Sequence, residues 1–502
     1  MAVSPPESFI ALQRFGLGAR PGDLKAIASD PRGALLAEIN PGALLIDDSA
    51  LPDTITAITD VRDIQMQRKA AKQNAQGAAS ASSPAPDASA SRAPDMAMGD
   101  GTSAAVDGGD TMMPAAGKGR GKKAKIAVTL PDGQKPGNPL SDELAARLDH
   151  AANAQTGFAE RWAMFWTNHF AIEAATGQLV RWTVGPFDRE AIRQHAFGSF
   201  HDLLFSVTQH PAMLAYLNNA TSIGPDSKAG LRQHKGLNEN HARELMELHT
   251  IGVQAGYTQA DVTSFAKVLT GWTFGQNQKQ PERFARFFFN ANAHEPGPQT
   301  VLGHVYNQPG VQQGDAVLAM LAAHPATAKH IATKLVRAFV ADTPPDDLVA
   351  LLSKTFMDTQ GDLGAVATAL VSADAAWTAP MQKLRLPQEY VLSACRALAV
   401  TPKPAMLMKD LNTLGQPIFD PPSPEGYHDD AATWLAPDAM ANRLDIAQSF
   451  AQQADSSADA REVADAVLGD AQSPATREAI ARAEGPVQGL TILLMSPEFQ
   501  RR

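Results

Sequence analysis

Apolar residues recur every three or four positions along most of the chain, the spacing that places side chains on one face of an α-helix. The clearest example covers residues 158–170, where aromatic side chains share one face. The same pattern recurs in the segments 188–196, 199–208, 211–220, 314–324, 326–341, 346–356, 363–372 and 387–399. The pattern therefore predicts a mainly α protein, a large multi-helix globular domain.

Strand character is confined to two neighbouring segments, residues 283–290 (RFARFFFN) and 299–306 (QTVLGHVY). A polar turn separates them, so we expect them to pair with each other as one small β-hairpin. Upstream, Thr258 has the side chain of a helix cap, and Gly271 can end the helix that would run to Leu269.

Residues 73–137 differ in composition from the rest of the chain. They are rich in Ala, Ser, Pro, Gly and Asp and nearly free of large apolar side chains, so they cannot offset the entropy of ordering. We interpret them as a disordered, low-complexity insert and their basic cluster at Gly117–Lys125 as a solvated tail. This divides the chain into an N-terminal helical part of the core (1–72), the insert (73–137), a central helical region (138–310) and a C-terminal helical region (311–502).

Composition narrows the function classes. The formal net charge is −10, which gives a nucleic-acid-binding role no electrostatic support. The single cysteine, Cys395, cannot form an internal disulfide or a cysteine-built zinc site. The chain has neither a signal peptide nor a segment approaching the ~20 apolar residues of a membrane helix. We therefore expect no membrane span and a cytoplasmic location by default, with a periplasmic location or export with a partner as alternatives.

Titratable residues are most concentrated in the segment 238–252, NENHARELMELHTIG. On a helix, Ala242, Leu245 and Met246 form its apolar face. Glu239, Arg243 and Glu247 follow one another at four-residue spacing along one flank, so that the arginine lies between two carboxylates. If exposed, each such pair stabilises a helix by only ~0.2–0.5 kcal/mol. If buried, the same charges need full pairing and point to function.

Glu244 lies on the other flank of this helix and has no basic partner at helical spacing except His241. An unpaired carboxylate beside an apolar face can act as a general acid or base, or as a metal ligand. We expect Arg243 to hold Glu239 or Glu247 ionised and Glu244 to have a raised pKa.

Two histidines outside this segment are further candidates. His169, in FWTNHF, ends the aromatic helix and is either a satisfied core residue or a site residue, and Asn168 could orient its ring. His294 lies in a loop after the aromatic strand segment 283–290. Two histidines with Glu244 or Glu247 could hold a divalent metal, but their spacing matches no metal motif, so the cofactor is left open. Phosphate-loop and hydrolase-elbow motifs are absent from the sequence.

Several motifs recur in an order that resembles a large bacterial family catalogued as domain-of-unknown-function family 1800. They are ALQRFGLGARPGDL, RWAMFWTNHF, IRQHAFGSFHDLLFSVTQHPAMLAYLNN, NENHARELMELHTIG, YTQADVTSFAKVLTGW, KLRLPQEYVLSACRAL and LGQPIFDPPSPEGYHDDAATWL. The positions that match the family pattern are Trp166, Asn168, His169, Arg193, Asn238, Glu239, Asn240, Arg243, Glu244, Glu247, Tyr257, Asp261, Gly271, Trp272 and His294. The resemblance implies a shared fold and site, without an established reaction.

The chain departs from the family pattern at three positions in two of these motifs. His241 stands where the family usually has tyrosine, and His249 where it has an aromatic or apolar residue. Tyr427 replaces a tryptophan after Gly426. A shared mechanism is therefore better sought at the matching positions than at these two histidines.

We expect the matching residues to form one polar pocket. The catalytic candidates are His169, Arg243, Glu244 and Glu247, and the binding candidates are Trp166, Asn168, Asn238, Glu239, Trp272 and, at the rim, His294. The function expected from them is a hydrolase or lyase that acts on a polymer or glycan through carboxylate acid/base chemistry. The alternative is a non-catalytic binding or assembly protein that works with the sulfatase-like partner often found beside family members.

The composition of residues 73–137 predicts where a protease first cuts the native protein. Trypsin should cleave first within this segment, which contains the basic cluster Gly117–Lys125, because a chain without an apolar core leaves its backbone accessible. Mass spectrometry of the first fragments identifies the site. First cleavage within residues 158–273 would show that the helical core opens more easily than the segment.

Overall fold

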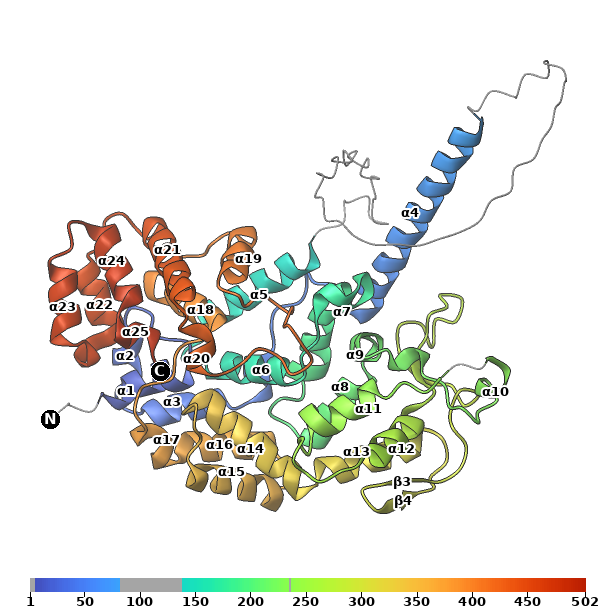
Figure 1. Cartoon of the computed structure of the whole chain (residues 1–502). Coiled ribbons are helices and arrows are strands. Elements are labelled where there is room, and N and C mark those ends of the chain that lie inside the picture. Colours follow the sequence, from blue (N-terminus) through green and yellow to red (C-terminus); the bar gives the residue numbers. More distant parts are fainter. Residues whose placement is uncertain (1–4, 82–137, 234–235) are drawn as a thin grey trace, which may run out of the picture. The chain divides into compact units, whose positions relative to one another are not determined.

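The computed structural model describes residues 5–81 and 138–502 apart from 234–235 (Figure 1). By their contacts, Met1–Val61 and Asn138–Arg502 belong to one compact unit and Arg62–Gly137 to another. The central and C-terminal regions, residues 138–310 and 311–502, thus fall in the same unit. Of the expected insert, residues 73–81 are helical, so the helix runs beyond the boundary at residue 73, and residues 82–137 lie outside the described part.

The described chain is mainly α-helical, as the apolar spacing predicts. Its first elements are α1 (Glu7–Ile10), the π-helical turn η1 (Ala11–Phe15), α2 (Asp23–Ala26), α3 (Pro31–Ala37), the 3-10 turn η2 (Pro41–Leu44) and α4 (Thr54–Ala81). The next are α5 (Pro139–Asn153), α6 (Phe158–His169), η3 (Ala174–Thr176), α7 (Gln178–Pro186), η4 (Phe187–Arg193), α8 (Phe200–Gln209), α9 (Pro211–Tyr216), η5 (Asn219–Thr221), α10 (Gly230–Gln233), α11 (Asn240–Glu244), η6 (Leu245–His249) and α12 (Gln259–Leu269).

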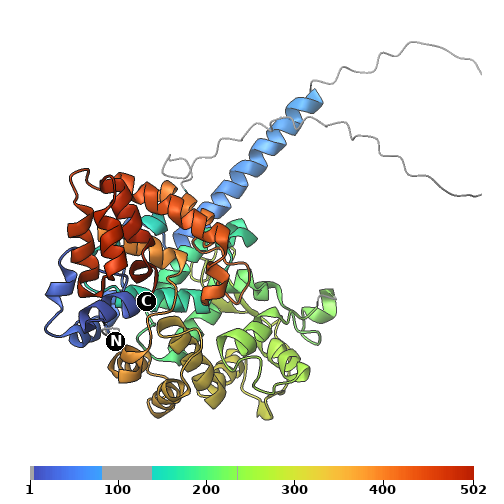
Figure 2. The ribbon, with the colours of Figure 1, turned by 60° about the vertical axis from the view of Figure 1, so that its left-hand side comes forward.

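The C-terminal elements are also helical, and two groups of them pack together. They are α13 (Val311–Ala322), α14 (Pro325–Phe339), α15 (Asp346–Asp358), α16 (Leu363–Ser372), α17 (Asp374–Thr378), α18 (Pro387–Leu398), α19 (Pro404–Thr413), α20 (Ala431–Trp434), α21 (Pro437–Gln453), α22 (Ala460–Leu468), η7 (Gly469–Ala471), α23 (Pro474–Ala481), α24 (Pro486–Met495) and α25 (Pro497–Gln500). Helices α14, α15 and α16 pack side by side, and α21, α22 and α23 pack around α24 (Figure 2).

The strands correct the expected hairpin. Strand β1 (Trp272–Phe274) pairs antiparallel with β2 (Phe287–Phe289), and β3 (Gln299–Val301) pairs antiparallel with β4 (His304–Tyr306). The two predicted strand segments therefore do not pair with each other. The second folds on itself because Leu302 and Gly303 both adopt positive φ, at 50° and 78°, the backbone of a two-residue turn whose twist matches that of the strands.

A buried ionic network joins α6 to its neighbours. Both terminal nitrogens of Arg193 donate to the Glu160 carboxylate, each at 2.7 Å, and its Nε donates to Asp188 at 2.7 Å. Asp188 also contacts Arg147 of α5 at 2.7 Å. All four side chains are buried, so removing one partner would leave a charge uncompensated in the core. The network thereby fixes α5, α6 and η4 against one another.

The signature segment forms the continuous helical stretch α11–η6. The side chains of Ala242, Leu245 and Met246 are fully buried, which confirms the predicted apolar face. Helix α12 follows and starts at Thr258, whose hydroxyl accepts from the Asp261 backbone while Asp261 caps in return. This confirms the predicted cap.

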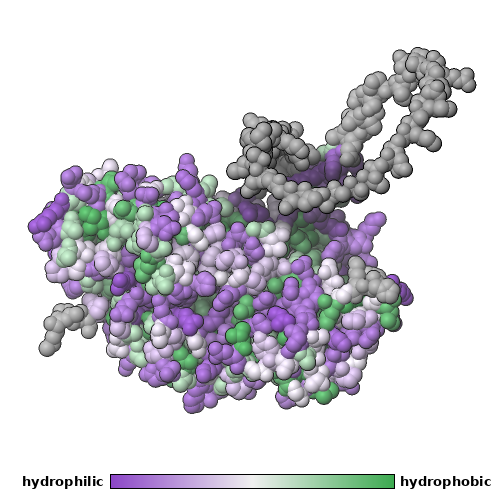
Figure 3. Space-filling model, viewed as in Figure 1, coloured by the Kyte–Doolittle hydropathy of each residue, from purple (hydrophilic) through white to green (hydrophobic). Residues whose placement is uncertain are grey.

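Side chains on the surface are mostly hydrophilic on the face shown in Figure 3, with small separate hydrophobic areas between them. Within the described ranges, the helices include none that is both long and apolar enough to cross a membrane.

Leu245→Ala tests whether the signature helix lies in the core. Leu245 has no exposed surface, so its truncation should lower the free energy of unfolding by ~2–5 kcal/mol in a urea titration. Leu231→Ala is the matched control, because that side chain is 66% exposed and its loss should cost less than about 0.5 kcal/mol. Equal effects of the two substitutions would contradict this position for the helix.

Candidate functional site

The signature helix starts on a hydrogen-bonded asparagine. The Asn238 side chain accepts from the Asn240 backbone at 2.9 Å and donates to the carbonyl oxygens of Leu217 and Asn218. Its backbone N–H donates to Ser222. Asn238, a predicted binding residue, is therefore occupied in tying the start of the helix to the end of α9.

The predicted charge ladder is present on the outer flank of the helix. Arg243 contacts Glu239 at 3.3 Å and Glu247 at 3.2 Å, and all three side chains keep between a fifth and about a third of their surface exposed. Hydrogen bonds from Thr263 and Gln259, together with the charge of Arg243, lower the pKa of Glu239. At this exposure the ladder contributes little to stability, but it fixes where the two carboxylates lie.

Glu244 differs from the other two carboxylates. It is half-buried and, among the described residues, has no hydrogen bond or ion pair. Burial raises the pKa of Glu244, and the negative charge of Glu247 raises it further. The raised pKa agrees with the expectation from the sequence, and its physical cause is partial desolvation beside a like charge.

Two tyrosines lie within electrostatic range of these carboxylates. Burial and the charges of Glu173 and Glu244 raise the pKa of Tyr216. Burial and a side-chain hydrogen bond with Glu247 raise the pKa of Tyr257 to about 12. We call the set Tyr216, Arg243, Glu244, Glu247 and Tyr257 the signature flank. It combines a raised carboxyl pKa, an ion-paired carboxylate and two phenol rings.

His169 lies behind this flank, in the core. Its Nε2 is 3.2 Å from the carbonyl oxygen of His249, and a carbonyl only accepts, so Nε2 carries the proton. His330 Nε2 donates in the same way to the Leu248 carbonyl at 3.1 Å. Both rings thus satisfy carbonyls at the C-terminal end of η6, which have no partner within the helix. His169 is fully buried.

The histidines that depart from the family pattern extend this core cluster. The His169 and His249 rings lie 6.0 Å apart, and those of His169 and His330 6.3 Å apart. His241 and His249 are buried, and neither ring nitrogen of either has a hydrogen-bond partner. Burial lowers the pKa of all four imidazoles, to about 3 for His241 and about 4 for His330. The cluster is therefore neutral at ordinary pH.

Three other predicted binding residues make contacts within the fold. Trp166 and Trp272 have no exposed surface, and Trp272 packs against Phe287 with ring centroids 5.2 Å apart. His294 is half-buried, and its Nδ1 lies 3.0 Å from the Thr270 carbonyl oxygen. The structure brings Glu239, Arg243, Glu244 and Glu247 together on one helix, whereas His169, Trp166 and Trp272 lie in the core.

Asn168 has a clear positioning role. Its side-chain oxygen accepts from the Tyr427 backbone N–H at 2.8 Å, and its side-chain nitrogen donates to the Tyr427 carbonyl oxygen at 3.0 Å. Gly426 precedes Tyr427 with φ +89°, and a Cβ there would lie 2.4 Å from the Asn168 carbonyl oxygen. Only glycine fits this approach. Asn168 therefore holds the loop 415–430 against the end of α6.

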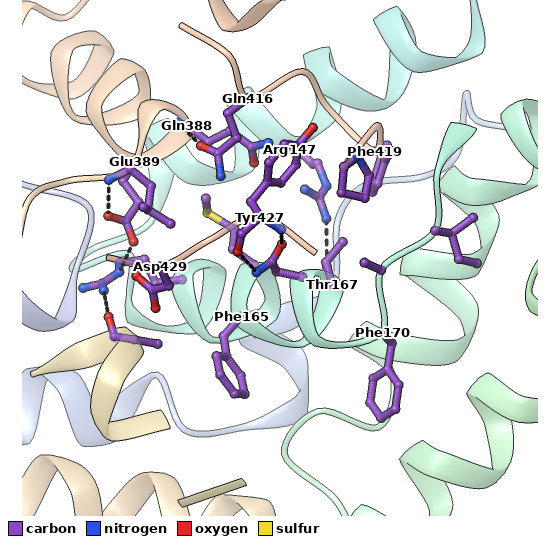
Figure 4. Close-up of a pocket in the computed structure, with 18 of the residues that line it drawn as sticks. Arg147, Phe165, Thr167, Phe170, Gln388, Glu389, Gln416, Phe419, Tyr427 and Asp429 are labelled. Atoms are coloured by element: carbon purple, nitrogen blue, oxygen red, sulfur yellow. Dashed lines mark hydrogen bonds and ion pairs between the residues drawn. The ribbon is translucent and has the colours of Figure 1, made fainter. Parts of the chain in front are cut away.

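That loop covers a cavity of about 810 Å³, measured out to its opening (Figure 4). Its polar lining comes from α5 (Arg147), α6 (Arg161, Asn168), the start of α18 (Gln388, Glu389), the loop (Gln416, Tyr427, Asp429) and Arg502. Phe419 and Tyr427 supply rings from the loop, whereas the rings of Phe165 and Phe170 point away from Gln388 and Gln416 (Figure 4). The lining thus draws on RWAMFWTNHF, KLRLPQEYVLSACRAL and LGQPIFDPPSPEGYHDDAATWL together.

Comparison with known proteins identifies the family. A model for the family described as "Protein of unknown function (DUF1800)" matches residues 10–501. The chain belongs to the DUF1800 family. Neither the curated proteins nor the solved structures include a match.

The cavity is the part of this DUF1800 protein that sequence reasoning missed. Its lining residues lie far apart in sequence, and each alone reads as an ordinary polar or aromatic residue. The sequence does hold one signal for this cavity. Three motifs that carry the family resemblance lie in separate parts of the chain, and such motifs could meet at a shared site in the fold. Around the signature helix, Tyr216 was also missed, because nothing in PAMLAYLNN marks its position beside Glu244.

The sequence left a divalent metal open. In the ranges that the structure describes, no group of three or more His, Cys, Asp or Glu side chains could hold a metal ion. Of the four core histidines, His169 and His330 donate to helix carbonyls.

The core histidines predict acid instability. Folding lowers the pKa values of these histidines below the ordinary 6.5. Below that pH the unfolded chain therefore binds more protons than the native protein does. The contribution of these histidines to the free energy of unfolding is fully present above pH ~6.5. It falls as the pH drops, by ~1.4 kcal/mol per pH unit for each histidine. The double variant His241→Leu/His249→Leu should therefore roughly halve the four-histidine part of this slope, measured by urea unfolding between pH 6.5 and 4.5.

His304→Leu is the matched control, because His304 is exposed on β4. It should leave the pH slope as it is in the unmodified protein. An unchanged slope in the double variant would mean that His241 and His249 are protonated in the folded protein.

Proposed function

We propose that the signature flank is the acid/base site of a hydrolase or lyase. One observation carries the proposal: Glu244 is a half-buried carboxyl with a raised pKa and without a hydrogen-bond or ion-pair partner in the described part of the chain, and Glu247, one helical turn on, is ion-paired with Arg243 at 3.2 Å. Carboxyls whose environments differ in this way can divide the roles of acid and base. Glu244 is the proton donor and Glu247 the proton acceptor.

The two reaction classes use these groups similarly. In hydrolysis, Glu244 protonates the leaving oxygen as the carbon–oxygen bond breaks, water adds to the carbon, and Glu247 takes the proton of that water. In elimination, Glu247 removes a proton from the neighbouring carbon, a carbon–carbon double bond forms, and Glu244 protonates the leaving oxygen. Arg243 and the hydrogen bond from Tyr257 keep Glu247 in place.

A polymer or glycan suits this position better than a small molecule. The charged side chains of the flank are partly exposed, so a substrate can reach them from outside as an extended chain. Tyr257 keeps part of its surface exposed beside the carboxylates, and a phenol ring offers an apolar face with a polar edge.

A non-catalytic role is the second candidate, and the exposure of the ladder favours it. Glu239, Arg243 and Glu247 are all accessible, and such charges can select a partner through complementary charge. The sulfatase-like protein suggested by the family resemblance would be one such partner. The two candidates differ in whether the proton on Glu244 matters.

Glu244→Gln separates them, because the amide keeps the shape and removes the titration. The full chain is assayed on a panel of neutral and acidic polysaccharides for release of reducing ends and for absorbance of unsaturated products. We expect Glu244→Gln to lower the rate by ~10²–10⁴-fold with an unchanged melting temperature. In the unmodified protein the rate should fall as the pH rises through the raised pKa of Glu244, because the acid form is the active one.

Glu462→Gln is the matched control, an exposed glutamate on α22 whose substitution should leave the rate unchanged. Carbon-13 labelling of the glutamate carboxyls gives the Glu244 pKa directly by NMR. If that pKa is ordinary, or if Glu244→Gln retains the full rate, the acid/base assignment is wrong and the binding role replaces it.

A further inference from the structure

The cavity under the loop 415–430 is a separate feature from the signature flank. Its lining includes no residue of the flank. The loop is held over it at both ends: Gln416 accepts from the Gln388 backbone at 2.8 Å, and Lys383 donates to the Asp429 carbonyl oxygen at 2.6 Å. The loop that covers the cavity is therefore held in place by hydrogen bonds.

The charges that line the cavity are paired within the protein. Arg147 contacts Asp188 at 2.7 Å, and Arg161 and Arg502 contact Glu389 at 3.1 and 2.8 Å. Asp429 contacts Lys383 at 2.8 Å. A charged ligand would have to compete with these partners after losing its own hydration. The lining thus favours an uncharged ligand.

The groups left for a ligand are mostly hydrogen-bond donors. Within the described residues, the Gln388 side chain and the Gln416 side-chain nitrogen have no hydrogen-bond partner. A polar group that is desolvated without a partner costs free energy that a ligand oxygen can recover. These two amides can therefore donate to hydroxyl or carbonyl oxygens.

Rings from the covering loop complete the lining. The Tyr427 hydroxyl donates to the Pro417 carbonyl oxygen at 2.6 Å, so its polar end is used by the protein and its ring is the part left for a ligand. In Figure 4 this ring is drawn between Gln416 and Arg147. The Arg147 guanidinium stacks on Phe419, 4.6 Å from the ring centroid. Rings and planar polar groups thus line the cavity together.

We propose that this cavity binds a single uncharged, hydroxylated ring with the chemistry of one neutral sugar residue. Its hydroxyl oxygens accept from the side-chain amides of Gln388 and Gln416, and the apolar face of its ring packs on Tyr427. The proposal does not rest on the acid/base chemistry of the signature flank, since it concerns binding and other residues.

Gln388→Leu tests it, because this side chain is half-buried and holds no other element in place. Binding of methyl glycosides of glucose, galactose and mannose and of N-acetylglucosamine to the full chain is measured by calorimetry, with glucuronic acid and glucosamine as charged counterparts. At least one neutral glycoside should bind and the charged counterparts more weakly. Gln388→Leu should weaken the neutral ligand about fivefold to tenfold, the effect of losing one hydrogen bond.

A matched variant locates the effect. Gln254→Leu changes an exposed glutamine near the signature helix and should leave the affinity unchanged. Gln388→Glu, which keeps the shape and adds a charge, repeats the test if the leucine variant is unstable. The proposal is overturned if no neutral glycoside binds, if a charged counterpart binds more tightly, or if Gln388 and Gln254 variants behave alike.

Loss of glycoside binding and loss of catalysis are separable outcomes. The same titration in Glu244→Gln should give the affinity of the unmodified protein, because Glu244 does not line the cavity. Equal loss in both variants would place the ligand at the signature flank and overturn the assignment to this cavity.

Discussion

The ion pairs buried around Arg193 are the constraint on which the arrangement of both sites depends. Arg193 satisfies Glu160 of α6 and Asp188 of η4, and Asp188 also satisfies Arg147 of α5. These charges are stable in the core only when all of them are paired, so the helices that carry them cannot shift independently. Helix α6 is held in one position as a result, and the cavity on one of its sides and the histidine contacts at its end follow from that position.

The signature helix shows how one short segment serves two purposes. Its inner face packs into the core, and its last carbonyls accept from His169 and His330. Its outer flank carries Arg243 between two carboxylates, with Glu244 set apart. A capped helix end fixes the rotation of the helix, and this rotation decides which carboxylates face solvent. The core histidines are therefore part of what positions the flank, although they do not reach it.

The flank and the cavity divide the chemistry of the protein. Accessible charged groups gather on the flank, whereas the charged groups that line the cavity are paired within the protein. Glu173 connects the two regions: its charge raises the pKa of both Tyr216 and Tyr427. The next residue, Ala174, donates its backbone N–H to the Phe419 carbonyl oxygen in the covering loop. This short segment therefore neighbours both the flank and the covering loop.

The sequence by itself determined the helical fold class, the cap at Thr258, the buried face of the signature helix and the ladder around Arg243, because each depends on neighbours within one or two helical turns. Tertiary structure decided the rest. His169 faces a helix end instead of a pocket, the aromatic strand segment pairs with Trp272–Phe274, and the cavity assembles from segments hundreds of residues apart. Periodicity shows which face of a helix is buried, but only long-range packing decides which other segment covers it.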